Sequence, residues 1–188
     1  MQGTKYYLFK ICLVGEGAVG KTCLIKRFVF DTFSDKYIVT MGTKITKINK
    51  LIMHPLKGTP TKVRMLIWDI MGQQGFRQML QDAYFYGCQG AMAVCDITRR
   101  NTMSLLDEWI KAVYSVAGEI PMVFLANKSD LKDKAQLCID DLEYFSSKYE
   151  RPHAFLTSAK TGENVDLAFE TLGKEILANK KKLSVSPM

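Results

Sequence analysis

Gly15-Glu16-Gly17-Ala18-Val19-Gly20-Lys21-Thr22 is the stretch that decides the fold of this chain. It follows an apolar run over residues 8–14 and precedes an apolar-rich run over residues 23–28, so the order is strand, glycine loop and helix. This is the context that the pattern G-x-x-x-x-G-K-[ST] requires for a loop that cradles phosphate. The alternative is an ordinary glycine turn between a strand and a helix, but the Lys-Thr pair in register favours the phosphate loop.

The glycines and the two residues after them have separate roles in such a loop. Gly15 and Gly20 allow backbone conformations that a side chain would forbid, so that successive N–H groups turn inward around a phosphate. The helix that begins near Gly20 adds the partial positive charge of its N-terminus. Lys21 can then reach the outer phosphates, and the Thr22 hydroxyl can ligate the Mg²⁺ that accompanies them.

Length and composition indicate a single domain. The chain has 188 residues, of which 47% are hydrophobic, and no repeat, low-complexity tract or linker divides it. We expect the domain to span residues 1–182 and to leave a short tail over residues 183–188. The net charge of +7 favours an anionic partner, but no basic stripe interleaved with aromatic residues is present, which argues against nucleic acid.

The cysteines indicate the compartment. They are scattered through apolar segments without C-x-x-C spacing, which predicts reduced core residues in a reducing compartment: Cys12, Cys23, Cys88, Cys95 and Cys138. No apolar run approaches the length of a transmembrane helix. We therefore expect a cytoplasmic protein whose contact with membranes is peripheral and made through its partners.

Apolar runs of strand length alternate with segments of helical period along the chain. Strands are predicted over residues 8–14, 43–53, 62–68, 90–96, 121–126 and 154–156, and helices over residues 20–28, 77–86, 102–118, 140–149 and 164–181. This order predicts an α/β P-loop fold, in which a doubly wound, six-stranded, mostly parallel sheet has helices on both faces and one antiparallel edge strand. Thr102 is expected to cap its helix and Gly118 to end it. The last helix is expected to turn the following residues inward: Val165, Leu167, Phe169, Leu172 and Ile176.

Polar residues fall at the carboxyl ends of the predicted strands, where ligands bind in such folds. Asp69, Asn127 and Ser158 each end or follow a strand. Together with the phosphate loop they belong to five motifs, and on these motifs the chain resembles the small GTPases of the Ras superfamily, most closely the Rab branch. The motifs are residues 15–22, Thr40, Asp-Ile-Met-Gly-Gln at 69–73, Asn-Lys-Ser-Asp at 127–130 and Thr-Ser-Ala-Lys at 157–160.

The Asn-Lys-Ser-Asp motif predicts guanine as the base. The Asp130 carboxylate can accept from N1–H and from the 2-amino group of guanine, whereas adenine would leave the charge unpaired. The resemblance implies that Lys128 and Phe33 cover the two faces of the base and that Asn127 ties this loop to the phosphate loop. It also implies that the last motif completes the pocket through Ser158, Ala159 and Lys160, with the Ala159 N–H at the guanine oxygen.

The resemblance further implies a magnesium site and two switch loops. The Thr22 and Thr40 hydroxyls would hold Mg²⁺ directly and Asp69 through water, and oxygen ligands suit this small, hard ion. Thr40 and Gly72 would contact the ion and the terminal phosphate only in the triphosphate state, so the loops at 31–43 and 70–82 would be released when that phosphate is lost. The remaining contacts to the phosphates would come from Gly17, Ala18, Val19, Cys23 and Tyr37.

Gln73 matches the glutamine that orients the attacking water, and Lys21 would act with it on the terminal phosphate. Relatives with a built-in arginine carry it three residues before the switch threonine, where this chain has Tyr37. The resemblance therefore implies slow hydrolysis of GTP to GDP and phosphate, on the order of 10⁻⁴ s⁻¹ as in Ras, and acceleration by an activating protein that supplies an arginine. Effectors at the switch loops and an exchange factor are the other expected partners of a monomer.

Some positions depart from the Rab pattern. Ile70-Met71 stands where Rab-like proteins have threonine-alanine, and Gln74 where they have glutamate. Met71 either crowds the terminal phosphate or points away into packing. Met71, Gln74 and the lack of a built-in arginine together leave open a GTP-loaded scaffold with little or no hydrolysis. An ATP-using enzyme conflicts with Asp130. No cysteine follows Cys138, so we expect no prenyl anchor on this chain.

Overall fold

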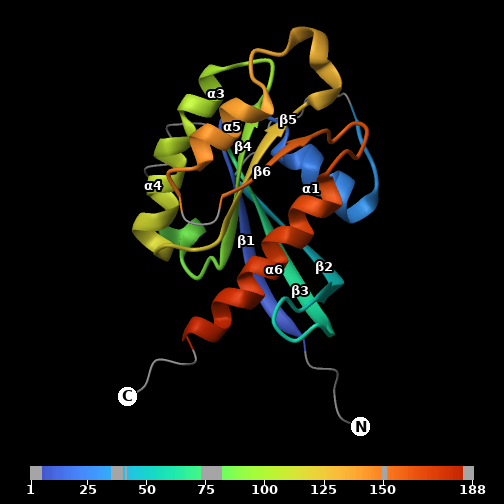
Figure 1. The fold of residues 1–188 in the computed structure, drawn as a ribbon, viewed down its shortest axis with the longest axis vertical. Helices are drawn as coiled ribbons and strands as arrows, with labels where there is room; N and C mark the ends of the chain where they lie inside the picture. The colour runs from blue at the N-terminus through green and yellow to red at the C-terminus, as the bar shows by residue number, and fades with distance from the viewer. Residues whose placement is uncertain (1–5, 35–39, 41, 73–81, 150–151, 184–188) are drawn as a thin grey trace.

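The structure is a computed structural model that describes residues 6–34, 40, 42–72, 82–149 and 152–183. It has one six-stranded sheet between two layers of helices (Figure 1). The strands are β1 (Tyr7–Val14), β2 (Thr43–Met53), β3 (Pro60–Ile70), β4 (Gly90–Asp96), β5 (Met122–Asn127) and β6 (His153–Thr157). The helices are α1 (Lys21–Phe30), α3 (Asn101–Ser104), α4 (Leu106–Ala117), α5 (Ile139–Ser146) and α6 (Val165–Leu183), with a 3₁₀ helix, η1, over Ser129–Lys134.

The strand order across the sheet is β2-β3-β1-β4-β5-β6. Among the described strand pairs, only β2 and β3 run antiparallel, from Thr43 opposite Ile70 to Met53 opposite Pro60. The predicted α/β sheet with one antiparallel edge strand is therefore confirmed. β1 lies between β3 and β4, so the phosphate loop at its carboxyl end has a strand on each side.

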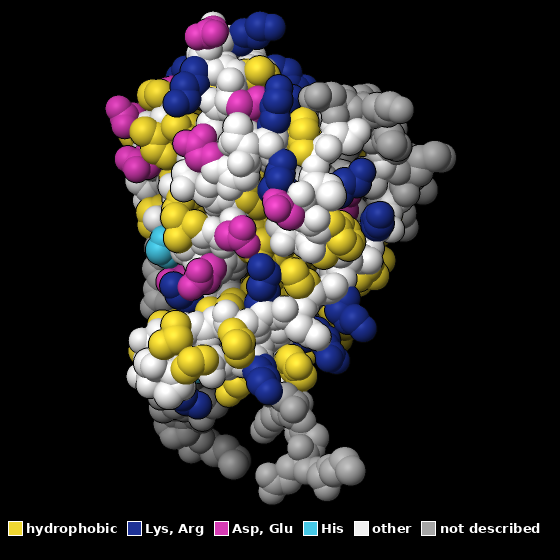
Figure 2. Space-filling view, turned by 90° about the vertical axis from the view of Figure 1, so that its right-hand side faces the viewer, with side chains coloured by type: hydrophobic (Ala, Val, Ile, Leu, Met, Phe, Trp, Pro, Cys, Tyr) yellow, Lys and Arg dark blue, Asp and Glu magenta, His cyan; other side chains and the backbone are white. Residues whose placement is uncertain are grey.

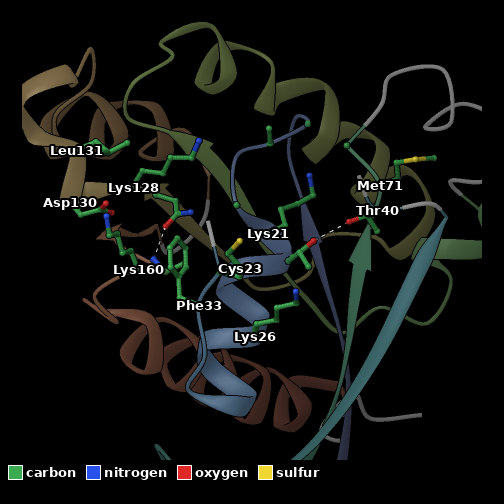
Figure 3. Close-up of a pocket in the computed structure, with 18 of the residues that line it drawn as sticks. Lys21, Cys23, Lys26, Phe33, Thr40, Met71, Lys128, Asp130, Leu131 and Lys160 are labelled. Carbon is green, nitrogen blue, oxygen red and sulfur yellow. Dashed lines mark hydrogen bonds between the residues drawn. The ribbon is translucent and has the colours of Figure 1, made fainter. Parts of the chain in front are cut away.

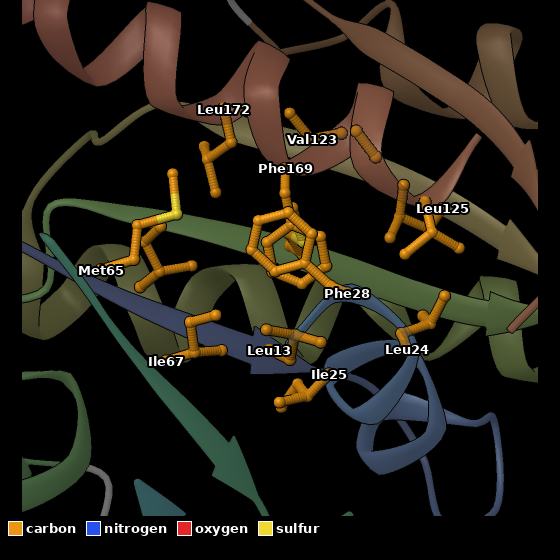
Figure 4. Packing of buried hydrophobic residues seen from close by; sticks show 14 of the residues in the cluster. Leu13, Leu24, Ile25, Phe28, Met65, Ile67, Val123, Leu125, Phe169 and Leu172 are labelled. Atoms are coloured by element: carbon orange, nitrogen blue, oxygen red, sulfur yellow. The ribbon is translucent and has the colours of Figure 1, made fainter. Parts of the chain in front are cut away.

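Two hydrophobic clusters hold the helices to the sheet. Successive β1 side chains face opposite sides, so that Leu13 belongs to one cluster and Val14 to the other. α1 and α6 cover the first face, and α3, α4 and α5 cover the second (Figure 1). Under α1 and α6, Phe28 stacks on Phe169 with ring centroids 4.0 Å apart and planes 4° from parallel (Figure 4). This contact fixes the helix that follows the phosphate loop to the last helix of the chain.

The predicted cap at Thr102 is wrong. The segment begins with α3 at Asn101, so Thr102 lies inside a helix and not before it. Its hydroxyl accepts from the Asp96 N–H at 3.0 Å and donates to the Arg99 carbonyl at 2.7 Å. The side chain therefore secures the end of β4. The predicted end at Gly118 is confirmed, because Gly118 has φ of +73° and donates its N–H to the Tyr114 carbonyl.

The predicted inward position of Leu167 is also wrong. Its side chain is 47% exposed, while Val165, Phe169, Leu172 and Ile176 are buried as predicted. Successive residues of an α-helix are about 100° apart, so a residue two positions after Val165 lies near the opposite side. The helix predicted over residues 77–86 falls largely outside the described residues, and its described end is helical over 82–85.

The cysteine prediction holds for part of the set. Cys12, Cys88 and Cys95 are buried and Cys23 is half-buried, but Cys138 is exposed. Cys138 comes directly before α5, where its N–H donates to Asp141 Oδ2 at 2.9 Å, and a position before a surface helix faces solvent. The five residues are therefore not all core residues.

Figure 2 shows how charged side chains are distributed over one face of the molecule. Lysine and arginine side chains are interspersed there with aspartate and glutamate, and no single basic stripe crosses this face. Hydrophobic side chains gather with basic ones toward its lower end. The exposed large hydrophobic residues of the β2–β3 hairpin are Ile45, Leu51, Met53 and Leu56.

Candidate nucleotide site

The loop between β1 and α1 requires glycine at both ends. Gly15 has φ of +134°, and a Cβ there would lie 2.1 Å from the carbonyl oxygen of Val94 on β4. Gly20 has φ of +100°, and a Cβ there would lie 2.2 Å from Nδ2 of Asn127. Both the left-handed conformation and the lack of space exclude a side chain. The loop is therefore held directly against β4 on one side and against the end of β5 on the other.

Lys21 lies beneath this loop with its side chain 6% exposed. Its Nζ donates to the Gly15 carbonyl at 2.6 Å and to the Glu16 carbonyl at 2.9 Å. Burial lowers the pKa of Lys21 to about 8, and the nearby carboxylates of Asp69 and Glu16 oppose this shift. Within the described part of the chain only neutral carbonyls bind this buried ammonium, so an anion can stabilise it further.

Three oxygen-bearing side chains from separate elements meet beside Lys21. Thr22 Oγ1 donates to Asp69 Oδ2 at 2.6 Å. It also lies 3.0 Å from Thr40 Oγ1 (Figure 3). Asp69 Oδ1 is buried and has no hydrogen-bond partner among the described residues. Burial raises the pKa of Asp69, and the Thr22 hydrogen bond and Lys21 oppose the shift. A buried carboxylate oxygen without a donor, next to two hydroxyls, fits a small, hard cation.

The other end of the site is built from the loops after β5 and β6. Asn127 Nδ2 donates to the Val19 carbonyl at 2.9 Å, and Asn127 Oδ1 accepts the Ala159 N–H at 3.3 Å. Ser158 Oγ donates to Asp130 Oδ1 at 2.6 Å. Asn127 therefore joins both loops to the phosphate loop, and Ser158 orients the Asp130 carboxylate.

A single cavity of about 380 Å³ connects these two ends, within the size range of small-molecule sites (Figure 3). The predicted site residues that line it are Gly17, Ala18, Gly20, Lys21, Thr22, Cys23, Phe33, Thr40, Gly72, Asn127, Lys128, Asp130, Ala159 and Lys160. Gly15, Val19, Asp69 and Ser158 support it from behind, through the contacts described above. Tyr37 and Gln73 lie outside the described residues.

Comparison with known proteins decides the family. The sequence model of the Ras family matches residues 10–178. This chain belongs to the Ras family. Human Ras-related protein Rab-8B is 37% identical over 179 residues, which cover 94% of this chain and 82% of Rab-8B. Rat Ras-related protein Rab-19 is 32% identical and covers 92% of this chain and 76% of Rab-19.

A third similar protein is the GTP-binding protein ypt1 of Schizosaccharomyces pombe, 35% identical over 90% of this chain and 80% of its own length. The predicted resemblance to Rab-like small GTPases is therefore confirmed. GTP binding and GTP hydrolysis are the activities of this family. Within the described part of the chain, no helix is both long and apolar enough to cross a membrane.

The two residues that follow β3, Met71 and Gly72, lie close to neighbouring loops. A Cβ on Gly72 would be 2.5 Å from the Glu16 carbonyl carbon and 2.6 Å from the Gly17 nitrogen, so the two backbones are in contact there. Met71 is buried, and its N–H donates to the Gly42 carbonyl at 3.2 Å. Met71 borders the cavity, but Figure 3 shows its side chain directed away from Lys21. Of the two alternatives for Met71, this arrangement favours the second.

Sequence reasoning missed Arg27. This α1 residue donates from Nε to the Ala159 carbonyl at 2.8 Å and from Nη2 to the Lys160 carbonyl at 2.6 Å. Its guanidinium therefore clamps the loop whose residues Ala159 and Lys160 line the cavity. No short motif surrounds Arg27. Its position in α1, less than two helical turns after the phosphate loop, was the available signal.

Proposed function

We propose that this chain is a Mg²⁺-dependent, Rab-like molecular switch that binds GTP and GDP and hydrolyses GTP to GDP and phosphate. The observation that carries the proposal is the single cavity with a phosphate loop at one end and the Asp130 carboxylate at the other. A nucleoside diphosphate or triphosphate is the ligand class that has an anionic end and a hydrogen-bonding base at such a separation.

Base selection is assigned to Asp130. Its Oδ1 is held by Ser158 at 2.6 Å, so the carboxylate is oriented before a base arrives. Guanine offers two N–H donors to a carboxylate, whereas adenine offers neither and would leave a desolvated charge unpaired. Lys128 and Phe33 both line the cavity and would enclose the base from its two faces.

Phosphate binding is assigned to the loop N–H groups and to Lys21. An arriving phosphate would replace the Gly15 and Glu16 carbonyls as the partner of the Lys21 ammonium. Thr22, Thr40 and Asp69 would hold Mg²⁺, and the buried, unpaired Asp69 Oδ1 supports this assignment. Mg²⁺ when bound supplies positive charge next to the phosphate oxygens.

Hydrolysis is assigned to Gln73, which would orient the attacking water, with Lys21 on the terminal phosphate. A slow intrinsic rate and an activating protein that supplies an arginine remain predictions of the family resemblance. Thr40 and Gly72 would sense the terminal phosphate, so the loops at 31–43 and 70–82 would be the effector surface. We further propose one domain over residues 1–182, a monomer, an exchange factor as partner, and a cytoplasmic location with peripheral membrane contact through partners.

The test is single-turnover hydrolysis of preloaded GTP with Mg²⁺. The native chain should turn over slowly, and Gln73→Leu should abolish turnover. Gln136→Leu makes the same change at an exposed position outside the cavity lining and should leave the rate unchanged. Met71→Ala should change the rate little, because the Met71 side chain is directed away from Lys21 (Figure 3). If the native chain and Gln73→Leu are equally inert while Met71→Ala is active, the chain is instead a GTP-loaded scaffold.

A further inference from the structure

The Asp96 carboxylate, at the carboxyl end of β4, accepts an unusually large number of hydrogen bonds. The residue is 0% exposed, and its two oxygens accept four hydrogen bonds. Oδ1 accepts from the backbone N–H of Thr98 at 2.9 Å and from its hydroxyl at 2.7 Å. Oδ2 accepts from Lys128 Nζ at 2.6 Å and from Arg99 Nε at 3.0 Å. This carboxylate is outside the five sequence motifs.

The four hydrogen bonds keep Asp96 charged. Burial by itself raises the pKa of Asp96, but the hydrogen bonds from Lys128 and Thr98 outweigh burial and leave this pKa below its ordinary value. A buried carboxylate of this kind is rigid, because each lost donor would leave a charge unsatisfied in a medium of low polarity. Asp96 is therefore a fixed anchor for the side chains that bind it.

Arg99 joins this anchor to the phosphate loop. While its Nε binds Asp96, its Nη2 donates to the Gly17 carbonyl at 3.0 Å. Arginine can do this because its planar fork presents two donors at a fixed spacing, which a lysine ammonium does not. Lys128, on the same Asp96 oxygen, belongs to the base loop. One carboxylate oxygen thus binds both the side chain that holds the phosphate loop and a side chain of the base loop.

The direction of the Gly17 carbonyl also sets the direction of the next N–H group in the phosphate loop. In a trans peptide the C=O of one residue and the N–H of the next point in opposite directions, and no cis peptide occurs among the described residues. A Gly17 carbonyl held toward Arg99 therefore directs the Ala18 N–H away from Arg99, and Ala18 lines the cavity. Ala18 also has φ of +61°, a conformation that is costly for a residue with a side chain and needs support from its surroundings.

We propose that Arg99 is a positioning residue of the nucleotide site, which orients the Gly17–Ala18 peptide toward the outer phosphates and, through Asp96, links the phosphate loop to Lys128. This inference rests on the proposed function, since it assumes a nucleotide in the cavity. It predicts that substitution of Arg99 lowers the affinity for a nucleotide more strongly when the nucleotide carries more outer phosphates. Loss of Asp96 releases Lys128 as well and weakens binding at both ends.

The experiment compares the affinities of GDP and GMP for the full chain by calorimetric titration in the presence of Mg²⁺. Arg99→Met keeps the side-chain stem and should weaken GDP about tenfold, the effect of one hydrogen bond to a charged group, while GMP affinity stays within twofold. Arg99→Lys should fall between native and Arg99→Met. The matched control is Arg100→Met, because the Arg100 guanidinium binds Gln136 and Asp141 instead of the phosphate loop.

The outcomes separate the inference from the proposed function. Equal weakening of GDP and GMP by Arg99→Met would overturn the inference in favour of a general role in folding, and so would a GDP effect no larger than that of Arg100→Met. Asp96→Asn should weaken GMP as well as GDP, and a loss confined to GDP would overturn the link to Lys128. If the native chain binds neither guanine nucleotide, the proposed function itself fails.

Discussion

Asp130→Asn should change the preferred base of this chain from guanine to xanthine. Ser158 Oγ donates to Asp130 Oδ1 at 2.6 Å, so the side-chain oxygen of an asparagine would be held in the same place. The amide NH₂ would then occupy the position of the second carboxylate oxygen and face the base. Guanine presents its 2-amino group there and would repel this NH₂, whereas xanthine presents a carbonyl oxygen that accepts from it.

The size of the effect follows from the number of hydrogen bonds that change. The carboxylate would accept two N–H donors from guanine, and a hydrogen bond to a charged group contributes about 1.5–3 kcal/mol. In Asp130→Asn the bond to the 2-amino group is lost and the bond to N1–H goes to a neutral oxygen, which together amount to about 3–4 kcal/mol, or roughly 10²–10³ in GDP affinity. Xanthosine diphosphate should gain at least about tenfold, because a repulsive contact with the carboxylate becomes a hydrogen bond.

The assay is calorimetric titration of nucleotide-depleted protein with GDP and with xanthosine diphosphate at constant Mg²⁺. Asp133→Asn is the matched control, since it makes the same change three residues later in η1 at an exposed position outside the cavity lining. It should leave both affinities within twofold. Unchanged GDP affinity in Asp130→Asn, or an equal loss for both nucleotides, would refute the role of Asp130 in reading the base.

Three further predictions concern the loop, Lys21 and the core. Gly15→Ala should lower the Tm of the GDP-loaded protein far more than Gly58→Ala: both have positive φ, which costs about 1–2 kcal/mol, but only the Gly15 Cβ would overlap a backbone oxygen, at 2.1 Å. Equal shifts would contradict the packing of the loop on β4. Because burial lowers the pKa of Lys21 to about 8 and a bound phosphate should raise it, GDP binding should take up about 0.8 proton at pH 8.5 and almost none at pH 7, measured by calorimetry in buffers of different ionisation enthalpy. Uptake that does not increase with pH would show that Lys21 stays charged without ligand. Phe169→Ala should lower the free energy of unfolding by about 3–5 kcal/mol and Leu167→Ala by less than about 0.5 kcal/mol, in denaturant titrations, and similar losses would contradict the stacked contact of α6 with α1.

Much of the fold could be predicted because its signals are local. Alternation of apolar runs with helical periods leaves few topologies open once connections are short and right-handed. The wrong predictions concern residue types that are usual for a cap or a core, at positions where the folded chain gives them another role. Thr102 has the chemistry of a helix cap, but the N–H of Asp96 at the end of β4 uses its hydroxyl. Leu167 is apolar like its neighbours, but the rotation of the helix leaves it 47% exposed.

The sequence by itself determined the phosphate loop at residues 15–22 and the base motif at 127–130, because in each the chemistry resides in adjacent residues and needs only the correct flanking strand or helix. Only the tertiary structure decided which distant side chains complete the site. Arg27 reaches Ala159 across 132 positions, and Arg99 reaches Gly17 across 82. Such contacts depend on the order of strands in the sheet and on individual side-chain rotamers. For the same reason, the direction of Met71 became visible only in the packed structure.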